Sequence, residues 1–137
     1  DTGAVNAVAT PTFSATDCAV WVWDADDTAY WQGVATPDGN TTPITKLEPS
    51  KGPAADTFEY LMVALEEDPA GTNQAAARFI LADADGDMVY DSGWNGLAIS
   101  DNVLLCPWIF AQNRDSGEDI DVFVDYLGVW QRATRTA

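Results

Sequence analysis

The sequence has no histidine, and only two of its 137 residues are cysteine. Without histidine, neither a Ser-His-Asp triad nor a zinc site built on imidazole can form. Two thiols, Cys18 and Cys106, are also too few for a structural zinc site. If they are bonded to each other, they close a loop of about ninety residues and stabilise the fold by about 4 to 5 kcal/mol. If they are free, they act as small apolar side chains, and the sequence leaves both states open.

Basic residues are scarce, with 6 Lys and Arg against 22 Asp and Glu, which gives a formal net charge of −16. A chain this acidic is repelled by nucleic acid and by anionic lipid, so we expect neither as a partner. The charge fits solubility in a salty medium, and cation binding is the functional alternative. No apolar run approaches the ~20 residues that a membrane helix needs, and no secretory leader pattern is present. Because the first residue is Asp1 rather than Met, we expect processing or truncation upstream.

The composition is 47% apolar and includes six tryptophans, so the chain has the material for a core. At this length a single domain over residues 1–137 can bury roughly two thirds of its unfolded surface. Residues 1–10 are small and weakly patterned, which predicts a flexible or docking arm. Residues 132–137 form a polar tail.

The longest strand pattern covers residues 119–131, which alternate with a period of two and contain no proline. A strand this apolar is expected inside a sheet. Further strands are expected at residues 12–15, 18–23, 28–35, 44–47, 57–65, 75–82, 88–90, 97–99 and 103–112. Helix competes with strand at 57–65, and Pro107 predicts a bulge or edge in 103–112.

Turn residues separate these strands. Asp85-Gly86 lies between two apolar runs and is a strong hairpin signal, and residues 24–27 suit a second hairpin. No segment favours helix convincingly. The pattern of about nine short strands predicts an all-β, antiparallel two-sheet β-sandwich.

The order of the pieces in the second half resembles the concanavalin-like (lectin/glucanase, laminin-G-type) jelly-roll superfamily. The resemblance covers residues 57–131. It rests on the strand TFEYLMVAL, the hairpin ARFILADADGDMVY, the strand LLCPWIFAQNR and the closing strand VFVDYLGVWQ. Modules of this kind occur as decoration or fibre proteins on virions of tailed bacteriophages and as secreted glycan-binding modules. The resemblance therefore implies a jelly roll on a virion surface or in an extracellular setting.

Glycoside hydrolysis is the sharpest enzymatic hypothesis, because Asp119, Asp121 and Asp125 share one face of the closing strand. Residues two apart on a strand are separated by about 6.6 Å, which suits paired carboxylates. However, the glucanase motif of the superfamily sits on an earlier strand, no glutamate recurs here at the required spacing, and Phe123 interrupts the face. We therefore interpret the three as solvated charges and expect no enzymatic activity.

Calcium is the one metal that the sequence suggests. Asp83, Asp85 and Asp87 around Gly86 could offer carboxylates to a hard cation, as could the aspartates of residues 24–27. The spacing does not fit an EF-hand, because Trp94 stands where the closing glutamate would be. Turn residues that cap a hairpin are the plainer interpretation.

Exposed aromatics that stack on sugars are the third hypothesis. Trp94 with Asn95 and Asp91, in a loop containing two glycines, is the best candidate for a glycan site. Packing of Trp94 over one end of the fold is an equally good interpretation.

The sequence thus predicts a non-enzymatic structural protein of a virion surface, a phage capsid decoration or fibre module. Its expected partners are identical subunits or other virion proteins. The alternative is a secreted carbohydrate-binding, lectin-like module. No cofactor other than calcium is expected.

Overall fold

The computed structural model describes residues 5–6, 12–13, 17–23, 29–36, 45–47, 49–67, 74–100, 105–107, 109 and 123–130. The chain divides into two compact units, residues 1–104 and 105–137. Each unit is described by itself.

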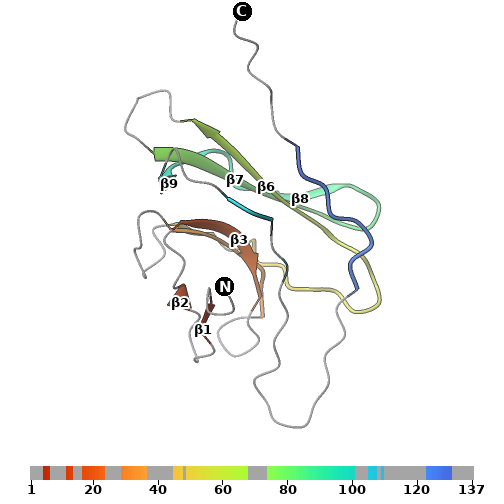
Figure 1. Ribbon diagram of the computed structural model, residues 1–137. Helices are drawn as coiled ribbons and strands as arrows, with labels where there is room; N and C mark the ends of the chain where they lie inside the picture. The colour runs from red at the N-terminus through yellow and green to blue at the C-terminus, as the bar shows by residue number, and fades with distance from the viewer. Residues whose placement is uncertain are drawn as a thin grey trace, which may run out of the picture. The chain divides into compact units, whose positions relative to one another are not determined.

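The first unit consists of antiparallel β-sheet, and the described residues contain no helix. The strands are β1 Val5–Asn6, β2 Thr12–Phe13, β3 Cys18–Val22, β4 Gln32–Thr36, β5 Thr45–Leu47, β6 Tyr60–Glu67, β7 Gln74–Ala82, β8 Met88–Asp91 and β9 Asn95–Ser100 (Figure 1). β1 pairs with β2, and β3, β4 and β5 form a second sheet in that order. β6, β7 and β8 form the third sheet, and β9 also pairs with β7. The all-β, antiparallel character predicted from the sequence is confirmed.

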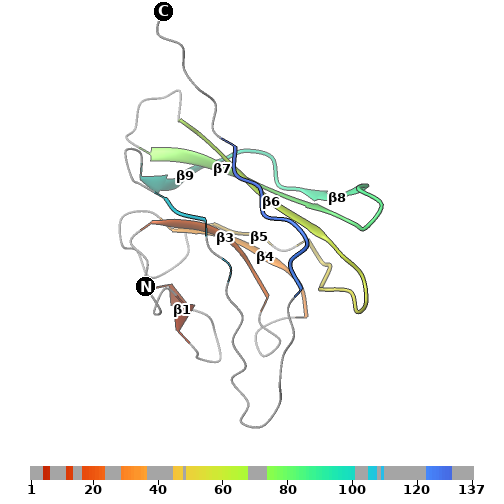
Figure 2. The same cartoon turned by 45° about the vertical axis from the view of Figure 1, so that its right-hand side comes forward.

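β7 organises the third sheet, because three strands pair with it (Figure 2). β6 runs along its whole length, from Tyr60 opposite Ala82 to Glu67 opposite Ala75. β8 pairs with the second part of β7 and β9 with the first part. The chain reverses between β7 and β8 at Gly86, which has a φ of 85° that favours glycine.

Alternation along β7 separates two faces of the third sheet. Ala77, Phe79 and Leu81 are fully buried, whereas Arg78 and Ile80 between them are only half-buried. Successive side chains of a strand point to opposite sides, so these two sets lie on opposite faces. We call the face of Phe79 the core face and the other the outer face.

The core is shared by the second and third sheets. Ala35 of β4 clusters with Ala77 and Phe79, and Trp21 of β3 packs against this cluster. The Trp21 ring meets Phe79 edge-on, with ring centroids 5.6 Å apart. Gly33 lets the ring of Phe79 lie close against the backbone of β4, because a Cβ on Gly33 would lie 2.7 Å from Cγ of Phe79.

Most predicted strands of the first unit are confirmed, with shifted ends. β3, β5 and β7 lie within a residue of their predicted positions, and the Asp-Gly hairpin joins β7 to β8 as expected. The predicted strand 57–65 is a strand rather than a helix, but it begins at Tyr60 and continues to Glu67. The first residues predicted for β4, 29–31, are not strand.

The two strands predicted in the second unit are wrong for the residues that the structure describes there. Residues 105–107 and 109 are not strand, and neither are residues 123–130. Alternation of side chains with a period of two indicates which residues would share a face of a strand. A strand also needs a neighbouring strand that satisfies its backbone N–H and C=O groups. Pro107 has no N–H to offer to such a ladder. In 123–130, Tyr126 and Trp130 instead lean together over Gly128, with ring centroids 6.2 Å apart.

Candidate functional site

The candidate site is an insertion, residues 92–94, between β8 and β9. These two strands pair one after the other along the same edge of β7. Asp91 pairs with Ile80 of β7, and Asn95 pairs with Ala77. Residues 92–94 therefore stand opposite Arg78 and Phe79, so that three residues face two. Such an insertion is a bulge, which bends the strand locally and redirects its side chains. Gly93, with a φ of 64°, lies at its centre.

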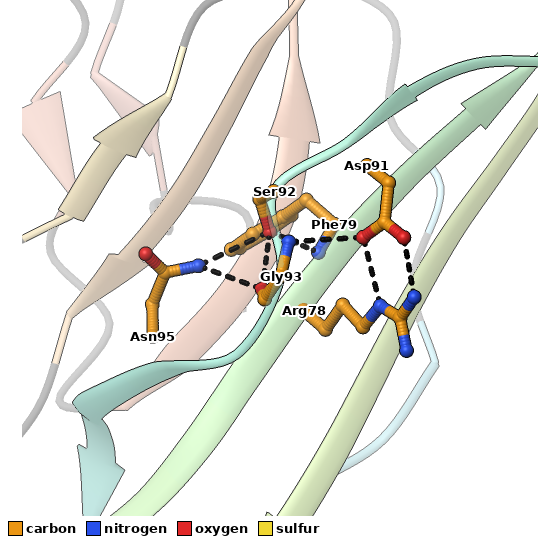
Figure 3. Close-up of polar contacts among 6 residues, drawn as sticks. All are labelled: Arg78, Phe79, Asp91, Ser92, Gly93 and Asn95. Atoms are coloured by element: carbon orange, nitrogen blue, oxygen red, sulfur yellow. Dashed lines mark hydrogen bonds and ion pairs between the residues drawn. The ribbon is translucent and has the colours of Figure 1, made fainter.

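Ser92 closes the backbone around the insertion (Figure 3). Its N–H donates to the carbonyl of Phe79 at 3.0 Å, and its Oγ accepts the N–H of Phe79 at 2.9 Å. The hydroxyl in turn donates to the carbonyl of Gly93 at 2.7 Å. Ser92 thus makes hydrogen bonds with both the N–H and the C=O of Phe79, which is fully buried. In a regular sheet, the backbone of a neighbouring strand would make these two bonds.

Asn95 completes this network from the other end of the insertion (Figure 3). Its Nδ2 lies 3.0 Å from the carbonyl oxygen of Gly93, 3.1 Å from Oγ of Ser92 and 3.3 Å from the carbonyl oxygen of Ala77. The amide nitrogen therefore makes its hydrogen bonds inside the protein.

Asp91 is held by Arg78, which lies beside it on the outer face (Figure 3). Nε of Arg78 donates to Oδ1 of Asp91 at 2.8 Å, and its NH2 group pairs with Oδ2. The N–H of Gly93 donates to Oδ1 at 2.9 Å. Arg78, and secondarily this N–H, lower the pKa of Asp91 from 3.8 to about 2. The carboxylate is thus an anion with an internal partner at all ordinary pH values.

Trp94 projects from the insertion and is 44% exposed. The guanidinium of Arg78 lies over its ring, 6.0 Å from the centroid, within the range of a cation–π contact. The three residues predicted for a glycan site therefore lie at this insertion, with Trp94 inside it and Asp91 and Asn95 at its two ends. Asp91 and Asn95 make hydrogen bonds within it, and Trp94 presents an aromatic surface.

The sequence analysis missed Arg78 and Ser92, the two residues that organise this insertion. Arg78 could have been found, because it is one of only 6 basic residues and it interrupts an otherwise apolar strand. Ser92 carries no comparable signal, because serine is common in loops.

An apolar surface adjoins the insertion on the outer face. Tyr60, Ala82 and Met88 stand side by side across β6, β7 and β8, and Met62 stands beside Ile80 in the next row. Tyr60 is 58% exposed and Met88 63% exposed. We call these five residues the outer patch. The Arg78–Asp91 ion pair borders it, since Asp91 pairs with Ile80.

The three aspartates predicted as calcium ligands surround the β7–β8 turn, where Asp83 acts as a cap. Its Oδ1 accepts the N–H groups of Asp85 at 3.1 Å and Asp87 at 3.0 Å. In the part of the chain that the structure describes, no three acidic or cysteine side chains are grouped so as to hold a metal ion. The alternative aspartates of residues 24–27 lie outside that part.

Cys18 and Cys106, for which the sequence left a disulfide and free thiols equally open, are free thiols. Sγ of Cys18 lies 3.3 Å from Oγ1 of Thr36, and burial raises the pKa of this thiol. Cys106 is exposed.

A second polar cluster surrounds Glu59, whose side chain is 8% exposed. Nε1 of Trp31 donates to its Oε2 at 2.9 Å, and Nζ of Lys51 forms an ion pair with Oε1 at 3.3 Å. The N–H of Trp31 also donates to the carbonyl of Lys51 at 2.8 Å. These contacts attach residues 49–59 to the start of β4, which is a structural role.

The remaining predicted site residues are only partly described. Asp125 is exposed, whereas Asp119 and Asp121 lie outside the described residues. Within the predicted arm 1–10, Val5 and Asn6 form β1 and pair with β2 of the same chain. The tail 132–137 lies outside the described part.

Comparisons with known proteins found no matching family model, no matching curated protein and no matching solved structure. Among the residues described, no helix is long and apolar enough to cross a membrane.

Proposed function

We propose that the chain is a non-enzymatic structural module of a virion surface, of the decoration or fibre type, which acts through contacts between subunits. We further propose that its sheets belong to a two-sheet, concanavalin-like jelly roll. The core that Trp21, Ala35 and Phe79 share between the second and third sheets supports this architecture. A fold of this kind hosts many functions, so the function is argued from the surface.

The observation that carries the proposal is the outer patch. Tyr60, Met62 and Met88 expose large apolar side chains on a protein whose net charge is −16. Exposed apolar patches with a polar rim mark protein–protein interaction sites. Tyrosine, methionine and arginine are also enriched at the centres of such interfaces. The patch contains tyrosine and methionine, and Arg78, paired with Asp91, forms part of its rim.

The non-enzymatic part of the proposal is supported by the chemistry of the insertion. In the part of the chain that the structure describes, the oxygen of Ser92 contacts Phe79, Gly93 and Asn95, and none of these groups is a base that could activate it. Asp91 is bound to Arg78, which makes it a poor proton acceptor. These groups stabilise the bulge.

Glycan binding is the alternative, and the exposed ring of Trp94 favours it. Sugar faces stack on tryptophan rings, and Arg78 fixes this ring from one side. Titration of the protein with soluble glycans, followed by tryptophan fluorescence, measures this alternative directly. Quenching that disappears in Trp94→Ala supports a lectin-like module.

The outer patch is tested by Met88→Lys, compared with Ala55→Lys as a control of equal charge change at an exposed position outside the sheets. Sedimentation velocity measures self-association of each full-length variant at high salt. We expect Met88→Lys to weaken association at least tenfold and Ala55→Lys to leave it unchanged. Equal association of the two variants contradicts a role for the outer patch.

A further inference from the structure

We propose that Asn95 and Gly96 form a modification site, at which deamidation of Asn95 irreversibly opens the insertion of residues 92–94. Asparagine is among the thermolabile residues of proteins. It deamidates fastest when glycine follows it, because no side chain then hinders attack by the next backbone nitrogen. The sequence contains an Asn-Gly pair once, at these two positions. The reaction takes place within one chain, so it goes beyond the proposed subunit contacts and does not depend on them.

The reaction needs no reagent other than water. The backbone nitrogen of Gly96 attacks Cγ of Asn95, the bond from Cγ to Nδ2 breaks, and the proton of the backbone nitrogen leaves with the amide group as ammonia. One water molecule then hydrolyses the cyclic succinimide that results. Opening at one carbonyl gives aspartate, and opening at the other gives isoaspartate, in which the main chain runs through the former side chain. Both products carry a carboxylate in place of the amide.

Gly96 has the freedom that this attack requires. It is exposed, and nothing lies within 4 Å of the position that a Cβ would take. Asn95 pairs with Ala77 of β7. The next described pair of the two strands is Ile99 with Ala75, so three residues of β9, beginning with Gly96, face one residue of β7. Such a register shift disrupts the ladder locally, so regular pairing does not fix the backbone at Gly96.

The hydrogen bonds of Asn95 protect it while the insertion is closed. Its Nδ2, the leaving group, lies within hydrogen-bonding distance of the carbonyl oxygens of Ala77 and Gly93 and of Oγ of Ser92. These contacts must break before the amide group can depart. Deamidation is therefore expected to follow local opening of the insertion.

The product is expected to prevent the insertion from closing again. The carbonyl oxygens of Ala77 and Gly93 only accept hydrogen bonds, and an ionised carboxylate in place of the amide has no donor to offer them. The side chain of Asn95 is half-buried, so an unpaired charge there destabilises the closed form. Each deamidation event therefore ends the fixed placement of Trp94 in that molecule.

The site is tested by peptide mass mapping of the native, full-length protein after incubation at mildly alkaline pH. We expect the peptide that contains Asn95 to gain the mass difference between an amide and an acid. Gly96→Ala is the control, because the open space admits a methyl group, and it is expected to slow the change several-fold. Equal rates in the two chains overturn the inference. So does an Asn95 that stays unmodified in the native protein under conditions that convert it in the urea-unfolded chain.

Control of the reaction by the insertion is tested with Ser92→Ala, which removes one acceptor of Nδ2 of Asn95. This variant is expected to deamidate several-fold faster. Urea below the unfolding midpoint loosens the unmodified chain in the same sense and serves if the variant does not fold. A deamidation rate that neither change raises would show that the insertion does not protect Asn95.

Asn95→Asp carries the carboxylate without the preceding chemistry and tests the irreversible step. We expect it to lower the urea midpoint at neutral pH, and to lower it less as the pH falls, because protonation removes the charge and restores a donor. Asn95→Ala is the matched control, because it removes the hydrogen bonds without adding a charge, and its effect is expected to be independent of pH. A midpoint for Asn95→Asp equal to that of the unmodified chain would contradict the opening of the insertion.

Discussion

At the scale of single residues, Arg78 and Asp91 link the insertion to β7. Two donors of the guanidinium engage both carboxylate oxygens, a geometry that lysine cannot reproduce. Arg78 also lies over Trp94, so one side chain fixes the carboxylate and the exposed aromatic ring together. Its position in an apolar strand is therefore explained by the insertion that faces it.

Replacement of Asp91 is expected to reveal this link as a pH-dependent stability difference. The folded-state pKa of Asp91, about 2, lies below its ordinary 3.8. The ion pair therefore stabilises the fold fully above about pH 4, and this contribution is lost as the pH falls through about 2. The difference in urea midpoint between the unmodified chain and Asp91→Asn should be constant near neutral pH and shrink below about pH 4.

Asp85→Asn, at an exposed turn position, is the matched control and should differ little from the unmodified chain. A difference for Asp91→Asn that does not change with pH would contradict the role of the ion pair.

Gly33 leaves the space that the ring of Phe79 occupies in the core. Gly33→Ala places a methyl group against the ring and is expected to destabilise the fold by about 1–3 kcal/mol. Phe79→Leu makes room, so the double variant should be less destabilised than the sum of the single variants. Chemical denaturation measures all three.

Gly96→Ala is the control, because nothing lies within 4 Å of a Cβ at that position. Additive effects of Gly33→Ala and Phe79→Leu would show that the two residues do not limit each other's space.

At the scale of elements, the insertion between β8 and β9 depends on Ser92. Ser92→Ala removes the acceptor for the N–H of Phe79 and is expected to cost about 1–3 kcal/mol. Thr57→Ala is the control, because the hydroxyl of Thr57 is exposed and its described hydrogen bond, to the carbonyl of Ala54, is long at 3.5 Å. Urea midpoints measure both variants, and an equal effect would rule out a special role for Ser92.

Strands with a buried face could be predicted from the sequence, because alternation reflects burial. This holds for β7, where Phe79 and Leu81 alternate with half-buried neighbours. The insertion could not be predicted, because it depends on the register of β8 and β9 against β7. Residues 123–130 were wrongly predicted as strand for a related reason. Their sequence alternates, but alternation does not show whether a neighbouring strand is present.

The candidate site could be predicted in part. Asp91, Trp94 and Asn95 were identified together because they lie close in the sequence. The hydrogen bonds of Asp91 to Arg78 and of Asn95 to Ala77, and the contact of Trp94 with Arg78, form only because β8 and β9 pair with β7.

At the scale of the whole molecule, the net charge of −16 opposes any association of identical copies. An interface made of apolar side chains has little charge attraction to lose, so screening mainly removes repulsion. Self-association is therefore expected to strengthen as salt is raised from low to moderate concentration. Sedimentation equilibrium at several salt concentrations measures the trend, and weakening with added salt would indicate an interface of complementary charges instead.

The native mass of the full-length chain, measured by light scattering at high salt over a range of protein concentrations, tests the central claim most directly. Contacts between subunits through the outer patch predict a defined oligomer whose mass reaches a plateau. A mass equal to one chain at every concentration would contradict the account and turn attention to Trp94 as a binding surface.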